Sequence, residues 1–206
     1  MIVTDPGVSA DGKAVAVDGE TVELTLLEYW MLYKPAGIIS ASKADLRDPD
    51  TPCVVDLIKE SRRGDLFPVG RLDKDTEGLL LISNDGKLAH DLLSPRKHVD
   101  KTYYAQLDGV LTEREIKRIE AGVDIGDEKP TLPCTIKVCE PGSVLITIRE
   151  GRFHQIKRMF ATAGLNVTYL KRLTMGSLRL DEALKPGEYR KLTEEELDGL
   201  RKTPSA

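Results

Sequence analysis

The sequence feature that most constrains the fold is the apolar run Leu79-Leu80-Leu81-Ile82, which directly follows a polar loop from Gly70 to Gly78. An unbroken apolar run of this length is typical of a strand that other elements cover on both faces. Such a strand requires packing layers on each side of its sheet. The polar loop before it therefore leads straight into the core of the protein.

The other local signals place strands and helices at irregular intervals along the chain. Further strands are predicted at Tyr29 to Tyr33, Lys101 to Leu107, Thr135 to Val138 and Val144 to Ile148. Helices are predicted from Thr51 to Glu60, from Gly86 to Ser94, from Thr112 to Gly122, from about His154 to Ala163, and after Thr193. No regular strand-helix alternation with a glycine-rich phosphate loop is present, so we predict a mixed α+β domain.

Composition excludes several classes of protein. With 40% hydrophobic and 31% charged residues, the chain of 206 residues is expected to be an ordinary globular protein. No apolar run approaches the roughly 20 residues that span a bilayer, and the start lacks the pattern of a signal peptide, so we expect a cytoplasmic protein without membrane contact. The scattered cysteines and histidines indicate neither disulfides nor a metal site: Cys53, Cys134, Cys139, His90, His98 and His154.

Charge is distributed unevenly. A net charge of −4 argues against a protein that coats nucleic acid without specificity. Between Arg149 and Leu180, however, Glu150 is the one acidic residue. The basic residues of this stretch are Arg149, Arg152, Lys157, Arg158, Lys171, Arg172 and Arg179. A local basic surface on an acidic protein is therefore possible.

The polar loop is the first segment that could carry chemistry. Acidic and basic residues are crowded between Gly70 and Gly78, and Asp73 lies near the middle. Spacing alone would favour a polar surface turn. The apolar residues on both sides should nevertheless press part of the loop into apolar surroundings, where a carboxylate needs a cationic partner to stay ionised.

The second segment is the predicted helix after Gly151. Ile156, Met159 and Phe160 would face inward on such a helix, whereas His154, Lys157 and Arg158 would share another face. A solvated basic face is the simpler interpretation. The functional alternative is that one cation pairs with a buried carboxylate while the others meet phosphates.

The third segment is Lys101-Thr102-Tyr103-Tyr104, which follows Arg96, Lys97 and His98. Consecutive tyrosines on a strand point to opposite faces of the sheet, so one of them could line a cleft while the other is structural. Most strand tyrosines are structural. An aromatic ring beside basic residues also suits a protein that stacks on an unstacked base while it holds the RNA backbone.

Together and in this order, four blocks resemble the sequence motifs of the pseudouridine synthases. The similarity is greatest to the family that modifies ribosomal RNA, within it to the small-subunit branch, and it extends from about Tyr29 to Leu200. The blocks are Met31 to Gly37, Gly70-Arg71-Leu72-Asp73 with Thr76 and Gly78, Lys101-Thr102-Tyr103, and Gly151 to Phe160.

The resemblance implies a role for individual residues. It implies that Asp73 is the catalytic aspartate, that Tyr103 lies against the target uracil, and that Lys157 pairs with the aspartate, with Arg158 as the neighbouring alternative for this basic position. Arg71 resembles the residue that fills the gap left by an extruded nucleotide. The residues expected to bind RNA are Arg71, Arg152, His154, Arg158, Lys171 and Arg172. No cofactor or metal is expected for this isomerisation.

The resemblance also implies an architecture: a mixed, mainly antiparallel sheet in two subdomains with a central active-site cleft. Such enzymes usually begin with an RNA-binding domain of the S4 type, and Ile2 to Val22 resembles only its final strands. We therefore expect residues 1–26 to be a partial S4-like remnant and residues 27–206 to be the catalytic domain. The expected partner is ribosomal RNA, free or in a ribosome assembly intermediate, and the expected state is a monomer.

Three other interpretations stay open at this point. One is the same chemistry on large-subunit ribosomal RNA. The second is an RNA-binding module without catalysis, which would explain the basic residues and tyrosines but not an acidic residue beside them, because carboxylates repel phosphate. The third is a hydrolase that uses Asp73 together with Asp75 or Glu77, and it requires two acids that face one cleft.

Overall fold

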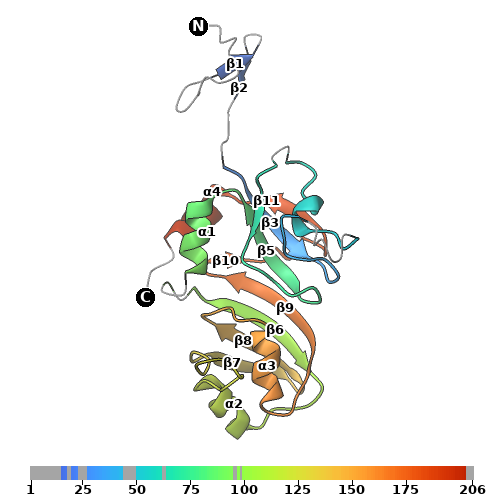
Figure 1. Ribbon diagram of the computed structural model, residues 1–206, viewed down its shortest axis with the longest axis vertical. Coiled ribbons are helices and arrows are strands. Elements are labelled where there is room, and N and C mark those ends of the chain that lie inside the picture. The colour runs from blue at the N-terminus through green and yellow to red at the C-terminus, as the bar shows by residue number, and fades with distance from the viewer. Residues whose placement is uncertain are drawn as a thin grey trace.

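The computed structural model in Figure 1 describes residues 27–43, 50–61, 64–94, 97 and 99–202, together with the backbone of 15–17 and 20–22. The strands of the first half are β1 (Val15–Val17), β2 (Glu20–Val22), β3 (Tyr29–Lys34), β4 (Phe67–Val69), β5 (Glu77–Ser83) and β6 (Lys101–Leu107). Those of the second half are β7 (Thr135–Glu140), β8 (Ser143–Ile148), β9 (Val167–Met175), β10 (Leu178–Arg179) and β11 (Tyr189–Lys191). The helices are η1 (Val54–Leu57), α1 (Gly86–Leu93), α2 (Glu113–Glu120), α3 (Gln155–Ala161) and α4 (Glu194–Arg201).

A nine-stranded mixed sheet organises the chain from β3 onward. Its main path runs β11-β3-β5-β9-β6-β8-β7, with β4 paired to β5 and β10 paired to β9. Among the described strands, β5 and β9 are the one parallel pair, and they are joined at Glu77↔Lys171 and Gly78↔Arg172. A Cβ on Gly78 would lie 2.2 Å from the carbonyl oxygen of Arg172. Glycine is therefore required where the two halves of the sheet meet.

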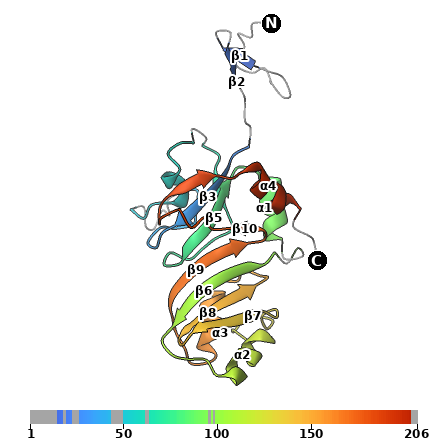
Figure 2. The same cartoon turned by 180° about the vertical axis from the view of Figure 1, so that it is seen from behind.

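The two halves of the sheet are covered differently. On β5, Leu80 and Ile82 enter a core that is shared with α2 and α3, whereas Leu79 and Leu81 pack toward α1 and α4 on the opposite face. The predicted strand buried on both faces is thus confirmed. In the other half, β6 alternates between buried and more exposed residues, so α2 and α3 cover one face of the sheet (Figures 1 and 2).

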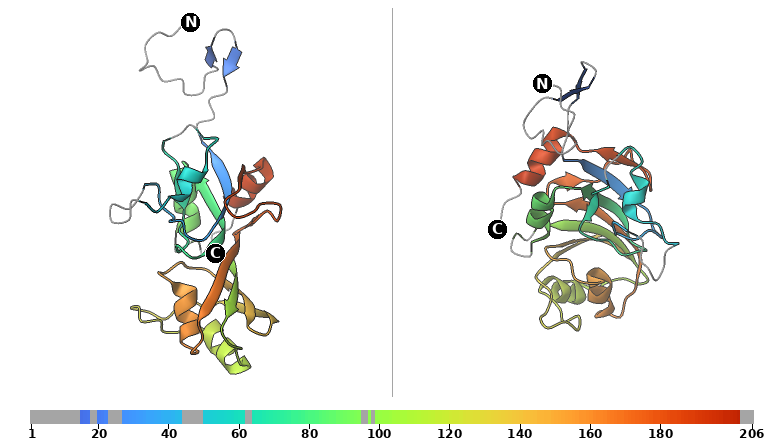
Figure 3. Two further views of the ribbon diagram at one scale, coloured as in Figure 1. Left: turned by 90° about the vertical axis from the view of Figure 1, so that its right-hand side faces the viewer. Right: turned by 45° about the horizontal axis from the view of Figure 1, so that its top comes forward.

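The predicted fold class is confirmed: a mixed, mainly antiparallel sheet with helices, in two parts. In Figure 3, β6 and β9 run between an upper part with β3, β5, α1 and α4 and a lower part with α2 and α3. The strands predicted from Tyr29 onward are present, and so are the helices that begin after Asp85, Thr112 and Thr193. Thr112 and Thr193 form the predicted capping boxes with Glu115 and Glu196.

The helix predicted from Thr51 to Glu60 is wrong in length. Only the short 3₁₀ helix η1 forms there, with Cys53 rather than Thr51 at its N-cap. The reason is tertiary: Ile39 donates its backbone N–H to Pro52 at 3.2 Å and accepts from that of Val54 at 3.0 Å. Backbone groups used in this bridge are not available to begin a helix at Thr51.

The N-terminal segment is described only in part. β1 and β2 pair antiparallel, on either side of residues 18 and 19. Most of residues 1–26 lie outside the described residues, so their assignment as an S4-like remnant stays a prediction. Arg96 and His98 also lie outside them. Among the described helices, none combines the length and the apolarity that a membrane crossing would require.

Candidate active site

The loop that carries Asp73 is held in place by Lys34, the last residue of β3. Lys34 at the end of β3 is fully buried, and its Nζ donates to the carbonyl oxygens of Pro35 (3.0 Å), Lys74 (3.3 Å) and Thr76 (2.9 Å). Burial lowers the pKa of this amine to about 8. A buried ammonium group hydrogen-bonded to carbonyl oxygens thus fixes the C-terminal part of the loop.

Ser40 fixes the N-terminal part of the same loop. Its Oγ accepts a hydrogen bond from the backbone N–H of Leu72 at 3.0 Å and donates to the carbonyl oxygen of Leu72 at 2.9 Å. Gly37 adds a backbone hydrogen bond to the carbonyl oxygen of Lys74 at 2.7 Å. Sequence reasoning missed Lys34 and Ser40 as supports of the site. A lysine at the end of an apolar strand was the one available signal.

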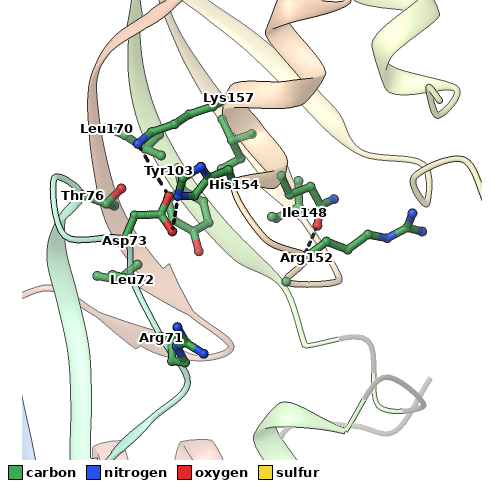
Figure 4. A pocket seen from close by; sticks show the side chains of 13 residues that line it. Arg71, Leu72, Asp73, Thr76, Tyr103, Ile148, Arg152, His154, Lys157 and Leu170 are labelled. Carbon is green, nitrogen blue, oxygen red and sulfur yellow. Dashed lines mark hydrogen bonds and ion pairs between the residues drawn. The ribbon is translucent and has the colours of Figure 1, made fainter. Parts of the chain in front are cut away.

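Asp73 lies in a pocket between the two halves of the sheet (Figure 4). Its side chain is 28% exposed, and its two oxygens lie 3.7 Å from Nε2 of His154 and 3.7 Å from Nζ of Lys157. Apolar side chains form much of the remaining wall, and they are Leu72, Tyr103, Ile148, Ile156 and Leu170. The structure therefore brings together Asp73, Tyr103 and Lys157, which the sequence had linked only by resemblance.

Lys157 is shared between two carboxylates. Its Nζ donates to both oxygens of Asp75, at 2.6 and 2.7 Å, whereas its distance to Asp73 is 3.7 Å. The hydrogen bond from Lys157 lowers the pKa of Asp75. The predicted pairing of Lys157 with Asp73 is thus present as an ion pair, but the shorter hydrogen bonds go to Asp75, whose side chain is 70% exposed.

The basic residues at the start of α3 point in different directions. His154 precedes the helix with φ 48° and ψ 32°, a left-handed conformation that is uncommon for residues other than glycine. His154 and Lys157 reach Asp73, but Arg158 turns away to Asp127 at 2.5 Å and to the carbonyl oxygen of Ile125 at 3.0 Å. The predicted common face is therefore correct for two of the three residues.

Arg152 is likewise bound to protein groups. Its guanidinium donates to Glu150 at 2.9 Å and to the carbonyl oxygens of Lys129 (2.5 Å) and Pro130 (2.8 Å). Arg152 and Arg158 thus hold the segment around Asp127 beside the cleft. Arg71, by contrast, is exposed, lines the pocket, and makes no hydrogen bond or ion pair with another described residue. It is available for a substrate.

The structure corrects the placement of two predicted RNA-binding residues. Arg172 is 1% exposed and donates from Nε to the carbonyl oxygen of Leu79 at 2.7 Å, so its guanidinium cannot reach a phosphate. Lys171 pairs across the strands with Tyr104 rather than Tyr103, which places it on the sheet face opposite the pocket. Its Nζ lies 4.5 Å from the ring centroid of Tyr33.

The other acidic residues of the loop do not form a second catalytic acid. Neither Asp75 nor Glu77 lines the pocket that contains Asp73. Glu77 accepts a hydrogen bond from the hydroxyl of Tyr169 at 2.9 Å, on the far face of the sheet. The hydrolase interpretation, which needs two acids facing one cleft, therefore lacks support. Among the described residues, no three His, Cys, Asp or Glu side chains gather as metal ligands would.

Comparisons by family model, by sequence and by structure agree on one protein family. The family model described as RNA pseudouridylate synthase matches residues 28–162. An uncharacterised RNA pseudouridine synthase of Bacillus subtilis is 48% identical over 92% of this chain and 80% of its own length. Ribosomal small subunit pseudouridine synthase A of Escherichia coli is 42% identical over 82% of this chain and 72% of its own. A crystal structure of a pseudouridylate synthase superimposes with a TM-score of 0.78 at 37% identity, covering 84% of this chain and 74% of that one.

Proposed function

Because this chain belongs to the RNA pseudouridylate synthase family, we propose that it isomerises a specific uridine of ribosomal RNA to pseudouridine, and that this uridine lies in the small subunit. The observation that carries the proposal is the position of Asp73, which meets two cationic or protonatable side chains in a pocket with apolar walls. The relatives named ribosomal small subunit pseudouridine synthase A support the choice of subunit.

The reaction sets requirements that the pocket meets. The bond from N1 of the base to the ribose must break, the base must rotate, and a new bond must form through C5, without loss of the base to water. The apolar residues around Asp73 favour the exclusion of water from this space. No electrons are gained or lost, so the reaction as proposed needs no cofactor.

The roles of the side chains follow from their positions. Asp73 is the nucleophile or the base, and the pocket is compatible with its attack on the uracil, attack on the ribose, or removal of a sugar proton. Nε2 of His154 and Nζ of Lys157 each lie 3.7 Å from one carboxylate oxygen of Asp73, so both side chains help to position it. Tyr103, 7% exposed on the same wall, supplies a stacking face for the uracil.

Base extrusion is part of the proposal. Removing a uridine from a helix or a tight loop costs about a few kcal/mol, and stacking on Tyr103 offsets part of it. Arg71 is exposed at the pocket and fills the vacated position in the RNA stack. The remaining parts of the proposal are that the enzyme acts as a monomer, in the cytoplasm, on ribosomal RNA or on a ribosome assembly intermediate.

The test is to map pseudouridine in ribosomal RNA. In vitro transcripts of small-subunit and large-subunit RNA, which contain no pseudouridine, are incubated with wild-type protein, with Asp73→Asn, and with Asp91→Asn as a control. Asp91 lies on α1, which packs on the face of the sheet opposite the pocket, and it pairs with Lys97. We expect a product in the small-subunit RNA with wild type and with Asp91→Asn, and a loss of at least about 10³-fold with Asp73→Asn.

The outcomes separate the alternatives. Product only in large-subunit RNA would show that the target uridine lies in the large subunit instead. Full activity of Asp73→Asn would contradict the assigned catalyst, and RNA binding by wild type without product would favour the non-catalytic module. The Asp73→Asn protein should fold normally, because the carboxylate is partly exposed and its contacts with charged groups among the described residues are the two ion pairs at 3.7 Å and a longer-range interaction with Lys34.

A further inference from the structure

A wide groove adjoins the pocket and leads away from it. It shares Arg71, Leu72, Asp73, Gly151, Arg152 and His154 with the pocket, and its other lining residues are Ile39 to Ala41, Lys43, Lys74 and Phe153. Its volume is ≈ 710 Å³, against ≈ 70 Å³ for the pocket. The groove is continuous with the pocket and has room for nucleotides that flank a uridine in the pocket.

Phe153 is an exposed aromatic residue on the rim of this groove. Its side chain is 72% exposed, the largest exposure among the exposed large hydrophobic residues that the structure describes. Its ring is stacked on that of His154, with centroids 3.8 Å apart and planes inclined by 17°. His154 holds this position with a left-handed backbone, a conformation that costs energy and tends to occur at functional sites.

The charge of the groove indicates which class of ligand would contact Phe153. The charged residues that line it are Lys43, Arg71, Lys74, Arg152 and Asp73. Even with Arg152 paired to Glu150, cations outnumber the one carboxylate. Cations beside an exposed ring are the combination that binds a nucleic acid backbone and stacks on an unpaired base. A protein partner would not need this excess of positive charge beside the catalytic carboxylate.

We propose that the stacked pair of Phe153 and His154 is a platform for the base of a nucleotide directly adjacent to the target uridine. This inference rests on the proposed function and adds to it a residue that determines specificity. The neighbouring base must be unstacked to reach the platform. The substrate is therefore a uridine in a single-stranded or locally opened segment, and the identity of its neighbour contributes to target choice.

The test is a cycle that combines protein variants with modified RNA. The substrate is a short single-stranded RNA containing the uridine found by mapping, prepared intact and with an abasic site on its 5′ or its 3′ side. Phe153→Leu keeps an apolar side chain but removes the ring, and Phe153→Tyr keeps the ring. Val110→Ala, which shortens another exposed apolar residue (63% exposed) outside the groove, is the matched control.

We expect Phe153→Leu to lower kcat/KM by about 10-fold or more on intact RNA, as for the loss of one stacked base, while Phe153→Tyr and Val110→Ala stay close to wild type. One of the two abasic sites should lower wild-type kcat/KM by a similar factor and have little further effect on Phe153→Leu. The abasic comparison with wild type does not depend on the folding of any variant.

Three results would overturn the inference. If wild type forms pseudouridine and neither abasic site changes its kcat/KM, the platform does not exist and the proposed function stands. Additive effects of Phe153→Leu and of both abasic sites would likewise exclude contact between ring and base. If wild type forms no pseudouridine in any ribosomal RNA, the proposed function and the inference fail together.

Discussion

The two walls of the cleft are built in different ways. The wall that carries Asp73 is fixed to buried groups, because Lys34 and Ser40 bind its backbone on either side of this proposed catalytic residue. The wall that carries Lys157 is fixed by partly exposed ion pairs, such as Arg152 with Glu150 and Arg158 with Asp127.

This difference separates stability from catalysis. Buried hydrogen bonds to a backbone carbonyl are costly to remove, because the abandoned group stays out of water. Exposed ion pairs contribute little to stability and are weakened by salt. Changes to Lys34 or Ser40, the buried supports of the Asp73 wall, should therefore destabilise the fold, whereas changes to the ion pairs of the Lys157 wall should alter activity with little effect on folding. Three predictions test this comparison.

The largest expected effect is that of Lys157→Met on activity. Loss of the ammonium group 3.7 Å from Asp73 removes a cation beside the carboxylate that we propose reacts, and kcat should fall by about 10²–10³-fold. Single-turnover kinetics on the mapped RNA measure this effect, and urea unfolding should show little change in stability. Lys171→Met, on the opposite face of the sheet, is the matched control. Equal losses for both variants would contradict the assignment.

The second prediction concerns Lys34 and the pH dependence of stability. The pKa of Lys34 is about 8 in the folded protein, whereas its ordinary value is 10.5. Between these values the unfolded chain binds more protons, so wild type should gain stability as the pH rises. Relative to Lys34→Met, this gain should be on the order of 2 kcal/mol between pH 8 and 10.5.

Urea unfolding at several pH values measures this difference. The Lys34→Met variant also leaves the carbonyl oxygens of Pro35 and Thr76 without their donor, so it should be less stable than wild type by about 1–3 kcal/mol at pH 7. Lys202→Met, whose side chain is 79% exposed, serves as control and should show a constant difference from wild type. A constant difference for Lys34→Met as well would refute the prediction.

The smallest expected effect is that of Asp75→Asn. Asp75 is 70% exposed, so loss of its ion pair with Lys157 should change the free energy of unfolding by less than about 1 kcal/mol. Lys157 remains beside Asp73, and kcat/KM should change by less than about tenfold. A loss as large as that of Lys157→Met would show that Asp75 positions the lysine, and the contrast between the two walls would then need revision.

The sequence alone predicted most elements of the fold. The capping boxes at Thr112 and Thr193 and the apolar run of β5 depend on neighbouring residues, and such local patterns are readable without a structure. The helix predicted at Thr51 failed for the opposite reason. Its backbone is used by Ile39, a contact between segments that no local pattern reveals.

Some features of the candidate site could likewise be predicted from the sequence, and others could not. Motif resemblance identified Asp73, Tyr103 and Lys157, which the fold places around one pocket. The basic stretch from Arg149 to Arg179 gave no sign that Arg172 is buried, or that Arg152 and Arg158 are bound by carboxylates and carbonyl groups. Charge counted along the sequence does not show which cations are already neutralised, because their partners come from other segments.

By itself, the sequence determined the type of strand, the caps of the helices and the residues of the four motifs, because each depends on side chains that are neighbours along the chain. Only the tertiary structure decided which cations remain available to a substrate. It joined β5 to β9 at Gly78 and thereby set the loop of Asp73 against α3, left Lys157 between two carboxylates, and placed Phe153 at the rim of the groove. These are distances between segments far apart in sequence, and packing of the whole sheet fixes them.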